Sequence, residues 1–343
     1  MAANYKQLYL RIRPLIIGVV ISFSALICLE GPFFILNHYK KYKQNYSSKN
    51  FLNKNYKPYS QDTNIATEVF HFESTSKIPA PIDKYAFRIT PIDSLLNRHK
   101  YALFLGCSFT WGEGVNPNET MPFYFGELAN EYKPYNLGIP GRGTQQMLEI
   151  LQALIKSQEN KLTKELRLKQ GILIYTFIDS HIPRVIGSMR VSIWGYNMPC
   201  YTIDDRDNLI KKGTFLSAKP FLTLFYNIIG REQIARYLKL DVPKINEGHI
   251  RLVYRIIKES AGLLKNKFQN DNFYVLIYPG SLYGKRLIPY FKQGGIKYLD
   301  YSNLDFKGLP FRLRNRHPSP LAYKVLAERI TKDLGIYDAA IKD

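Results

Sequence analysis

YALFLGCSFTWGEGV (residues 101–115) joins a short apolar run to a turn in which glycines surround a serine. A continuous apolar run of this length, ending at a glycine, is typical of a buried strand. Ser108 follows the strand at once, so its hydroxyl would project from the edge of a sheet. A hydroxyl held in such a turn is well placed to act as a nucleophile.

The rest of the chain repeats this alternation of strand and helix. Further short strands are predicted at residues 134–138, 172–178, 273–278 and 296–301. Segments with helical spacing are predicted at residues 120–132, 144–156, 220–240, 250–268 and 320–334. Apolar strands that alternate with amphipathic helices predict an α/β fold, with a parallel sheet covered on both faces. Ligands bind at the carboxyl ends of the strands in such sheets.

Two other segments would bring chemistry to the same edge of the sheet. NLGIPGRG (residues 136–143) follows the second predicted strand, and its glycines leave backbone N–H groups uncovered that can stabilise an oxyanion. RNRHPSPLAY (residues 314–323) places His317 on a loop before the last helix. A histidine there can reach a serine after the first strand, so Ser108 and His317 are a candidate nucleophile and base.

The three motifs together resemble those of the SGNH (GDSL) hydrolases. They are GxSxTxG at residues 106–112, NxGxxG at 136–141 and HPS at 317–319, in that order. The resemblance covers about residues 84–334, except 187–248, and is closest to a bacterial membrane-anchored subgroup. It implies a flavodoxin-like three-layer α/β/α sandwich and the hydrolysis or transfer of acyl esters on carbohydrates or lipids.

The resemblance also implies a role for individual residues. Ser108 corresponds to the nucleophile and His317 to the general base. The N–H groups of Ser108 and Gly141 correspond to the oxyanion donors. Asp179 falls at the position of a third donor, which is an asparagine in the family, and an ionised carboxylate cannot donate a hydrogen bond. Either Asp179 is protonated, or His181 supplies the donor, or the third donor is missing.

Two more departures from the family pattern concern the catalytic residues. Cys107 replaces the usual aspartate before the serine, which leaves a cysteine nucleophile as a less favoured alternative to Ser108. The aspartate that usually precedes the histidine is absent. The Asn315 side chain or a backbone carbonyl would then orient His317 in a Ser–His dyad, or Asp300 or Asp305 would supply the acid from a distance.

The N-terminal region has a different character. Residues 14–36 are nearly all apolar and about long enough to cross a bilayer, with Glu30 their only charge. We predict a short tail at residues 1–13, a transmembrane anchor at 14–36, a juxtamembrane stalk at 37–77 and the SGNH-like domain at 78–343. A cleaved signal peptide is the rival interpretation, but no convincing cleavage site follows the apolar stretch.

The net charge of +20 first suggests an acidic partner. However, +8 of it lies in the first 60 residues, where an anionic lipid surface explains it. No nucleic-acid-binding motif is present. Three cysteines and scattered histidines lack the spacing of a metal site, and no cofactor is expected.

Together with the apolar N-terminal stretch, the family resemblance implies a membrane-anchored serine esterase or acyltransferase that acts on acyl esters of envelope carbohydrate or lipid. Its domain would lie on the extracytoplasmic side of a bacterial inner membrane, a side that the family resemblance implies. The alternative is a catalytically degenerate SGNH-like protein that binds a glycan or serves in an envelope complex. The missing aspartate and the position of Asp179 motivate that alternative.

Overall fold

The computed structural model describes residues 30, 32–33, 36, 87–92, 98–156, 161–308 and 310–336. These residues belong to two compact units. The larger unit takes its described residues from Pro58–Gly187, Asn197–Ala218 and Ile245–Asp343. The smaller unit consists of Ser188–Tyr196 and Lys219–Lys244, together with the described residues between 30 and 36.

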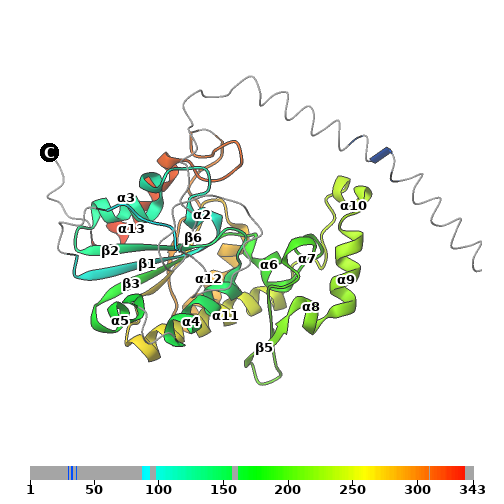
Figure 1. The fold of residues 1–343 in the computed structure, drawn as a ribbon, viewed down its shortest axis with the longest axis horizontal. Coiled ribbons are helices and arrows are strands. Elements are labelled where there is room, and N and C mark those ends of the chain that lie inside the picture. The colour runs from blue at the N-terminus through cyan, green and yellow to red at the C-terminus, as the bar shows by residue number, and fades with distance from the viewer. Residues whose placement is uncertain are drawn as a thin grey trace, which may run out of the picture. The chain divides into compact units, whose positions relative to one another are not determined.

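The larger unit is built on a five-stranded parallel sheet with the order β2-β1-β3-β6-β7. Figure 1 labels β1, β2, β3 and β6 of this sheet. This is the flavodoxin-like order. The second strand is added on one side of β1 and all later strands are added on the other side. The strands are β1 (Lys100–Gly106), β2 (Tyr132–Gly138), β3 (Gly171–Phe177), β6 (Phe273–Ile277) and β7 (Lys297–Asp300).

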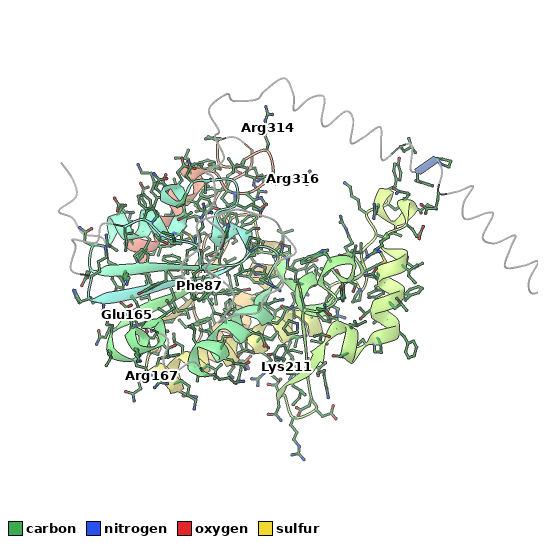
Figure 2. All side chains as sticks on the ribbon, in the orientation of Figure 1. Phe87, Glu165, Arg167, Lys211, Arg314 and Arg316 are labelled. Carbon is green, nitrogen blue, oxygen red and sulfur yellow. The ribbon has the colours of Figure 1, made fainter. Side chains whose placement is uncertain are left out.

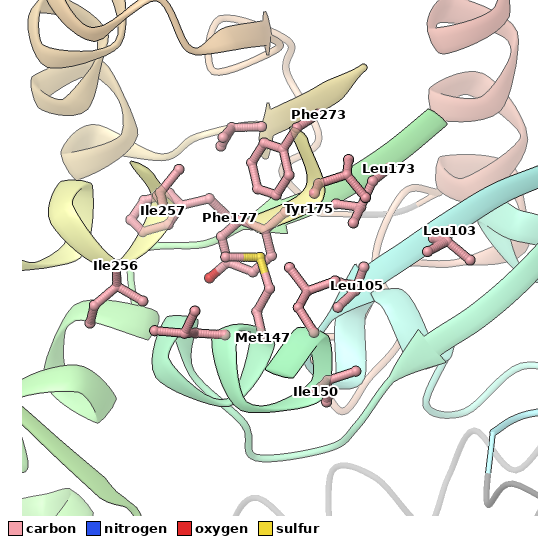
Figure 3. Packing of buried hydrophobic residues seen from close by; sticks show 14 of the residues in the cluster. Leu103, Leu105, Met147, Ile150, Leu173, Tyr175, Phe177, Ile256, Ile257 and Phe273 are labelled. Carbon is pink, nitrogen blue, oxygen red and sulfur yellow. The ribbon is translucent and has the colours of Figure 1, made fainter. Parts of the chain in front are cut away.

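Helices cover both faces of the sheet because successive side chains of each strand point to opposite sides. In β1, Leu103 and Leu105 join one buried cluster, which Figure 3 shows, and Ala102 and Phe104 join the other. The first cluster includes side chains of α4 (Thr144–Lys156), α11 (Glu247–Phe268) and α12 (Leu282–Gly294). The second includes those of α3 (Met121–Leu128) and α13 (Pro320–Asp333). The predicted three-layer α/β arrangement is therefore confirmed.

Shorter elements complete the larger unit. One of them is an antiparallel hairpin formed by two strands, residues 199–203 and 209–214. The sequence did not predict this hairpin, because its second strand carries exposed lysines instead of an apolar run. The elements are α2 (Ser108–Trp111), η1 (Pro117–Glu119), α5 (Lys161–Leu168), α6 (His181–Ile186), β4 (Pro199–Ile203), β5 (Leu209–Thr214) and α8 (Phe215–Ala218).

Between residues 188 and 244, the smaller unit contains the helices α7 (Met189–Gly195), α9 (Pro220–Ile229) and α10 (Gln233–Tyr237), and its described residues 30, 32, 33 and 36 are helical as well. The single helix predicted over residues 220–240 is wrong. The chain leaves α9 at Gly230, whose N–H donates to the Tyr226 carbonyl, and α10 begins after Glu232. Gly230 keeps helical dihedral angles, with φ −66°, and the low helix propensity of glycine makes continuation of the helix less favourable here.

The predicted membrane anchor lies almost entirely outside the described residues. Of residues 14–36, only Glu30, Pro32, Phe33 and Leu36 are described. Among the described residues, no helix combines the length and the apolar character needed to cross a membrane. The predicted tail at residues 1–13 and the stalk at 37–77 also fall outside them.

Candidate active site

The serine lies in a tight turn at the carboxyl end of β1. Gly106 has φ +155°, and a Cβ there would lie 2.3 Å from Oγ1 of Thr110, so the turn requires a glycine. Ser108 opens α2 directly afterwards, and its carbonyl accepts hydrogen bonds from the N–H groups of Gly112 and Glu113. Its side chain is buried at the edge of the sheet.

A buried arginine braces this turn from outside it. Nη1 of Arg88 donates to the carbonyls of Trp111 and Gly112 at 2.7 and 2.6 Å, and Nη2 donates to that of Val115 at 2.6 Å. The guanidinium therefore satisfies carbonyls at the end of α2 that the short helix leaves without partners. Hydrogen bonds from a charged group are stronger than those between neutral groups, so Arg88 holds the serine turn in place.

The turn after β2 lies against the serine turn. A Cβ on Gly138 would lie 2.4 Å from the Trp111 nitrogen, so the two backbones approach too closely for a larger residue. The Asn136 amide donates to the Trp111 carbonyl at 3.2 Å. Gly141 follows with φ +78°. Within the part of the chain that the structure describes, the N–H groups of Ser108 and Gly141 donate to no other group. Both remain available for an oxyanion.

His317 is presented by a closed loop before α13. Its carbonyl accepts from the Leu313 N–H at 2.8 Å, and Arg316 takes φ +68° to complete the turn. Figure 2 labels Arg314 and Arg316 in this loop. Asn315 accepts a hydrogen bond from the His317 backbone N–H at 3.0 Å. The Asn315 side chain therefore contacts the histidine at its backbone N–H, and no hydrogen bond to the imidazole ring is found for it among the described residues.

The loop brings His317 to the serine, 209 residues away in the chain. Nε2 of His317 lies 2.8 Å from Oγ of Ser108. A carboxylate oxygen of Glu113 lies 3.4 Å from the same Nε2. Nδ1, where a third catalytic group would bind, is buried and has no hydrogen-bond partner among the described residues. Ser108 and Glu113 therefore both lie near Nε2 of His317, and no acid lies at Nδ1 among the described residues.

Opposing influences determine the pKa of His317. Burial lowers the pKa most strongly, and the nearby Arg184 guanidinium lowers it further. The Glu113 carboxylate and the Asn315 hydrogen bond raise it, and the net effect is a pKa below the ordinary histidine value. A lowered pKa keeps the imidazole neutral at neutral pH, which is the form that can accept a proton from Ser108.

Asp179 follows β3, as predicted, but its carboxylate is engaged elsewhere. It accepts hydrogen bonds from the Ser281 hydroxyl and from the N–H groups of Leu282 and Tyr283, at 3.0 and 3.1 Å from the two nitrogens. The N-terminus of α12 attracts the carboxylate because its first N–H groups lack partners within the helix. The suggestion of Asp179 as an oxyanion donor is therefore corrected: its side chain caps a helix.

The other two acids proposed from the sequence, Asp300 and Asp305, accept hydrogen bonds from residues close to them in the chain. Asp300 accepts hydrogen bonds from the Ser302 N–H and hydroxyl, and Asp305 accepts one from the Lys307 N–H. No hydrogen bond joins either acid to His317 among the described residues. Cys107 is a buried free cysteine. The structure thus gives His317 no distant acid from these positions.

His181, the other candidate donor, is fully buried. Its Nδ1 lies 2.6 Å from the Tyr175 hydroxyl, and the Tyr175 hydroxyl lies 2.8 Å from Oγ1 of Thr144. Burial and the nearby Arg184 charge hold the pKa of His181 well below its ordinary value. Nε2 has no hydrogen-bond partner among the described residues. No group of three His, Cys, Asp or Glu side chains able to hold a metal ion occurs in the described part of the chain.

Sequence reasoning missed two residues of this site. Glu113 belongs to the same GEG turn as the quoted serine motif, so its place in that turn was the available signal. Arg88 carried no such signal, because its contacts reach residues 23 to 27 positions further along the chain.

Comparison with known proteins finds similarity among solved structures. No family model and no curated protein matches the sequence. The chain is similar to a member of the lipolytic protein G-D-S-L family from Veillonella parvula DSM 2008, with 14% identity over 68% of this chain and 97% of that one, at a TM-score of 0.38. It is also similar to the acetyl xylan esterase Est2A from the rumen bacterium Butyrivibrio proteoclasticus, with 13% identity over 73% of this chain and 66% of that one, at a TM-score of 0.35. At these identities and scores, the functional assignment depends on the site's own residues.

Proposed function

We propose that this protein is a serine ester hydrolase or O-acyltransferase. The observation that carries the proposal is the 2.8 Å contact between Oγ of Ser108 and Nε2 of His317. Within hydrogen-bond distance, an imidazole of lowered pKa can act as general base for a hydroxyl, which is otherwise a weak nucleophile. The free N–H groups of Ser108 and Gly141 add the donors that an acyl-transfer site needs.

The reaction proceeds in two half-reactions. Oγ of Ser108 attacks the ester carbonyl carbon while its proton passes to Nε2 of His317, and the N–H groups of Ser108 and Gly141 hold the resulting oxyanion. The tetrahedral intermediate expels the alcohol, which takes the proton from Nε2, and leaves an acyl group on Ser108. Water then attacks the acyl carbon and gives a proton to Nε2. The second tetrahedral intermediate breaks its bond to Oγ of Ser108, which takes the proton back from Nε2, and the acid is released. In acyl transfer a second hydroxyl takes the place of water.

Glu113 supplies the charge that the missing aspartate would have supplied. When Nε2 receives the serine proton, the imidazolium lies 3.4 Å from the Glu113 carboxylate. Attraction at this distance stabilises the charged ring in the transition state. The backbone of Glu113 is fixed by its own hydrogen bond to the Ser108 carbonyl, so the acid moves with the nucleophile turn.

The family resemblance and the N-terminal sequence support a proposal for the substrate and the location. We propose acyl esters of envelope carbohydrate or lipid as substrates. We also propose that residues 14–36 anchor the chain in a bacterial inner membrane, with the hydrolase unit extracytoplasmic. The apolar composition of residues 14–29 and the basic residues on either side of residues 14–36 support the anchor.

Activity-based labelling tests the proposed chemistry. The full chain in detergent would be treated with a fluorophosphonate probe and, separately, with a short-chain acyl ester. We expect covalent labelling and ester turnover in the wild-type chain, and neither in Ser108→Ala. Equal background in the two chains would overturn the proposal.

Two further variants sharpen this test. Cys107→Ala leaves the serine in place, so labelling should persist, whereas loss of labelling with a folded chain would favour the cysteine alternative. His317→Gln keeps a polar side chain but removes the base, and should abolish turnover. A wild-type chain that binds a glycan without any labelling or turnover would point to the degenerate binding protein instead.

A further inference from the structure

Helix α9 of the smaller unit is oriented with its apolar side outward. Phe221 is 88% exposed, Leu224 58% and Phe225 57%, and Ile228 is more than half exposed as well. Most of the large apolar side chains that the described residues expose belong to this unit: Leu36, Trp194, Tyr196, Phe221, Leu222, Leu224, Phe225, Ile228, Ile229, Leu238, Leu240 and Val242. An apolar patch of this kind marks a surface that contacts something else.

The inward side of α9 is its polar side. The Asn227 amide donates to the Ser192 carbonyl of α7 at 3.0 Å, Thr223 is buried, and a Cβ on Gly230 would lie 3.0 Å from Ile193. These positions recur every three or four residues and form one stripe. Successive residues of a helix are about 100° apart around its axis. The exposed apolar side chains of α9 therefore span an arc of roughly 160°, on the side opposite this polar stripe. Helices of water-soluble proteins place these two sides the other way round.

The charges of the same unit identify the partner. Its exposed charged side chains are basic: Arg190, Lys219, Arg231, Arg236, Lys239 and Lys244. Its acidic side chains Glu30, Glu232 and Asp241 are half-buried, and Asp241 accepts hydrogen bonds from the Ser188 hydroxyl and the Arg190 N–H, both at 3.0 Å. An apolar helix face bordered by Lys and Arg is the pattern of a helix that lies in the interface of an anionic bilayer.

The connection to the N-terminal apolar segment gives independent support. The Glu30 carboxylate accepts hydrogen bonds from the N–H groups of Gln233 and Ile234 at the start of α10, with 3.1 Å to Ile234. The Phe33 ring meets Tyr237 edge to face, with centroids 4.9 Å apart. Glu30 and Phe33, which come just after the apolar stretch at residues 14–29 in the sequence, therefore contact the helix that follows α9. A bilayer that receives this stretch would therefore meet the chain a few residues before the contacts with α10.

We propose that the α9 face, defined as Phe221, Leu222, Leu224, Phe225, Ile228 and Ile229, inserts into the headgroup region of an anionic lipid bilayer. The basic residues of the unit would contact lipid phosphates, and the apolar side chains would reach about 5–10 Å into the acyl boundary. The proposed membrane contact is separate from the proposed hydrolysis, because no residue of the α9 face belongs to the candidate active site. The smaller unit acts as a membrane-binding module.

Depth-dependent quenching of a fluorescent label tests the proposal. A polarity-sensitive dye would be attached at Phe221→Cys in the full chain, in a Cys28→Ser background, because Cys107 and Cys200 are buried. Leu168→Cys is the matched control, since Leu168 is 86% exposed but lies on α5 of the larger unit. The chain would be reconstituted into phosphatidylcholine vesicles with or without phosphatidylglycerol, carrying nitroxide at a shallow or a deep acyl position.

We expect a blue-shifted Phe221→Cys label that shallow nitroxide quenches more than deep nitroxide, and more strongly with phosphatidylglycerol. The Leu168→Cys label should stay in water. Adding Leu224→Glu to the Phe221→Cys chain should reduce the quenching, whereas adding Lys164→Glu on α5 should not. Equal, weak quenching at the two labelled sites would overturn the proposal. A blue-shifted label that no nitroxide reaches would also overturn it, because the face would then be covered by a second copy or by this chain.

Discussion

Helices α4 and α9 carry similar apolar patterns but use them in opposite ways. Met147, Leu151 and Leu154 of α4 are buried against the sheet, whereas Phe221 of α9 and its neighbours are exposed and the polar stripe of α9 packs on α7. Helical spacing therefore predicts that a helix has two unlike sides, but not which side faces the protein. The sheet unit provides an internal partner for α4, and we propose a lipid partner for α9.

The largest expected effect separates the two regions by function. Ser108→Ala should lower kcat/KM for a short acyl ester by about 10⁴-fold or more, since the nucleophile and base act as one unit. The same substitution should leave the lipid quenching at Phe221→Cys unchanged. Steady-state kinetics and vesicle quenching on one preparation measure both. A parallel loss of quenching would show that the regions are not independent.

The next effect compares matched leucines on the two helices. Leu151→Ala should reduce the free energy of unfolding by about 2–5 kcal/mol, because it opens a cavity in a fully buried cluster. Leu224→Ala should change it by less than about 0.5 kcal/mol, because Leu224 is 58% exposed. Urea denaturation of the full chain in detergent checks both. A large loss for Leu224→Ala would mean that protein, and not lipid, covers the α9 face.

An intermediate effect concerns the acid beside His317. The neutral imidazole is the active base, so activity rises as the pH passes its pKa. Glu113 raises that pKa, so Glu113→Gln should move the acid limb of the kcat/KM profile to lower pH. The plateau rate should fall about tenfold, a loss of about 1.4 kcal/mol of transition-state stabilisation.

Arg184 provides the opposite control for this prediction. Because its charge lowers the pKa of His317, Arg184→Gln should move the acid limb to higher pH. The two profiles would be measured in the same buffers and at the same ionic strength. Shifts of the same sign in the two variants would contradict the electrostatic explanation.

The smallest effect compares how the two units begin a helix. The Ser319 hydroxyl accepts from the Ala322 N–H at the start of α13, whereas Lys219 before α9 makes no side-chain cap. Ser319→Ala should lower the free energy of unfolding by about 1 kcal/mol. Lys219→Ala should leave it nearly unchanged, as thermal unfolding of the two variants would show. Equal losses would mean that Lys219 contributes to stability by another route.

Local sequence patterns were sufficient for the parallel sheet. The apolar runs before Gly106 and at residues 172–178 predicted β1 and β3 to within one residue, because buried strands need little beyond continuous apolar character. The β4–β5 hairpin lacked that pattern and was missed. The break after α9 was missed because the apolar spacing continues across Gly230.

The candidate site was predictable where its residues belong to short motifs. Ser108, Gly141 and His317 each lie in such a motif, and the structure brings Ser108 and His317 together. The role of Asp179 stayed open at the sequence level because its strand-end position indicated the site, whereas the start of α12, about one hundred residues later, accounts for its carboxylate. That competition depends on tertiary contacts, which one segment of sequence does not contain.

Arg88 has a practical consequence for how the protein can be shortened. Although it precedes every strand of the sheet, its guanidinium holds three carbonyls of the nucleophile turn. A truncated version that starts at β1 would retain Ser108, Gly141 and His317 and yet lose this brace. A shortened version that is meant to keep the nucleophile turn intact must therefore include Arg88, and inactivity of one that lacks it would say nothing about the catalytic residues.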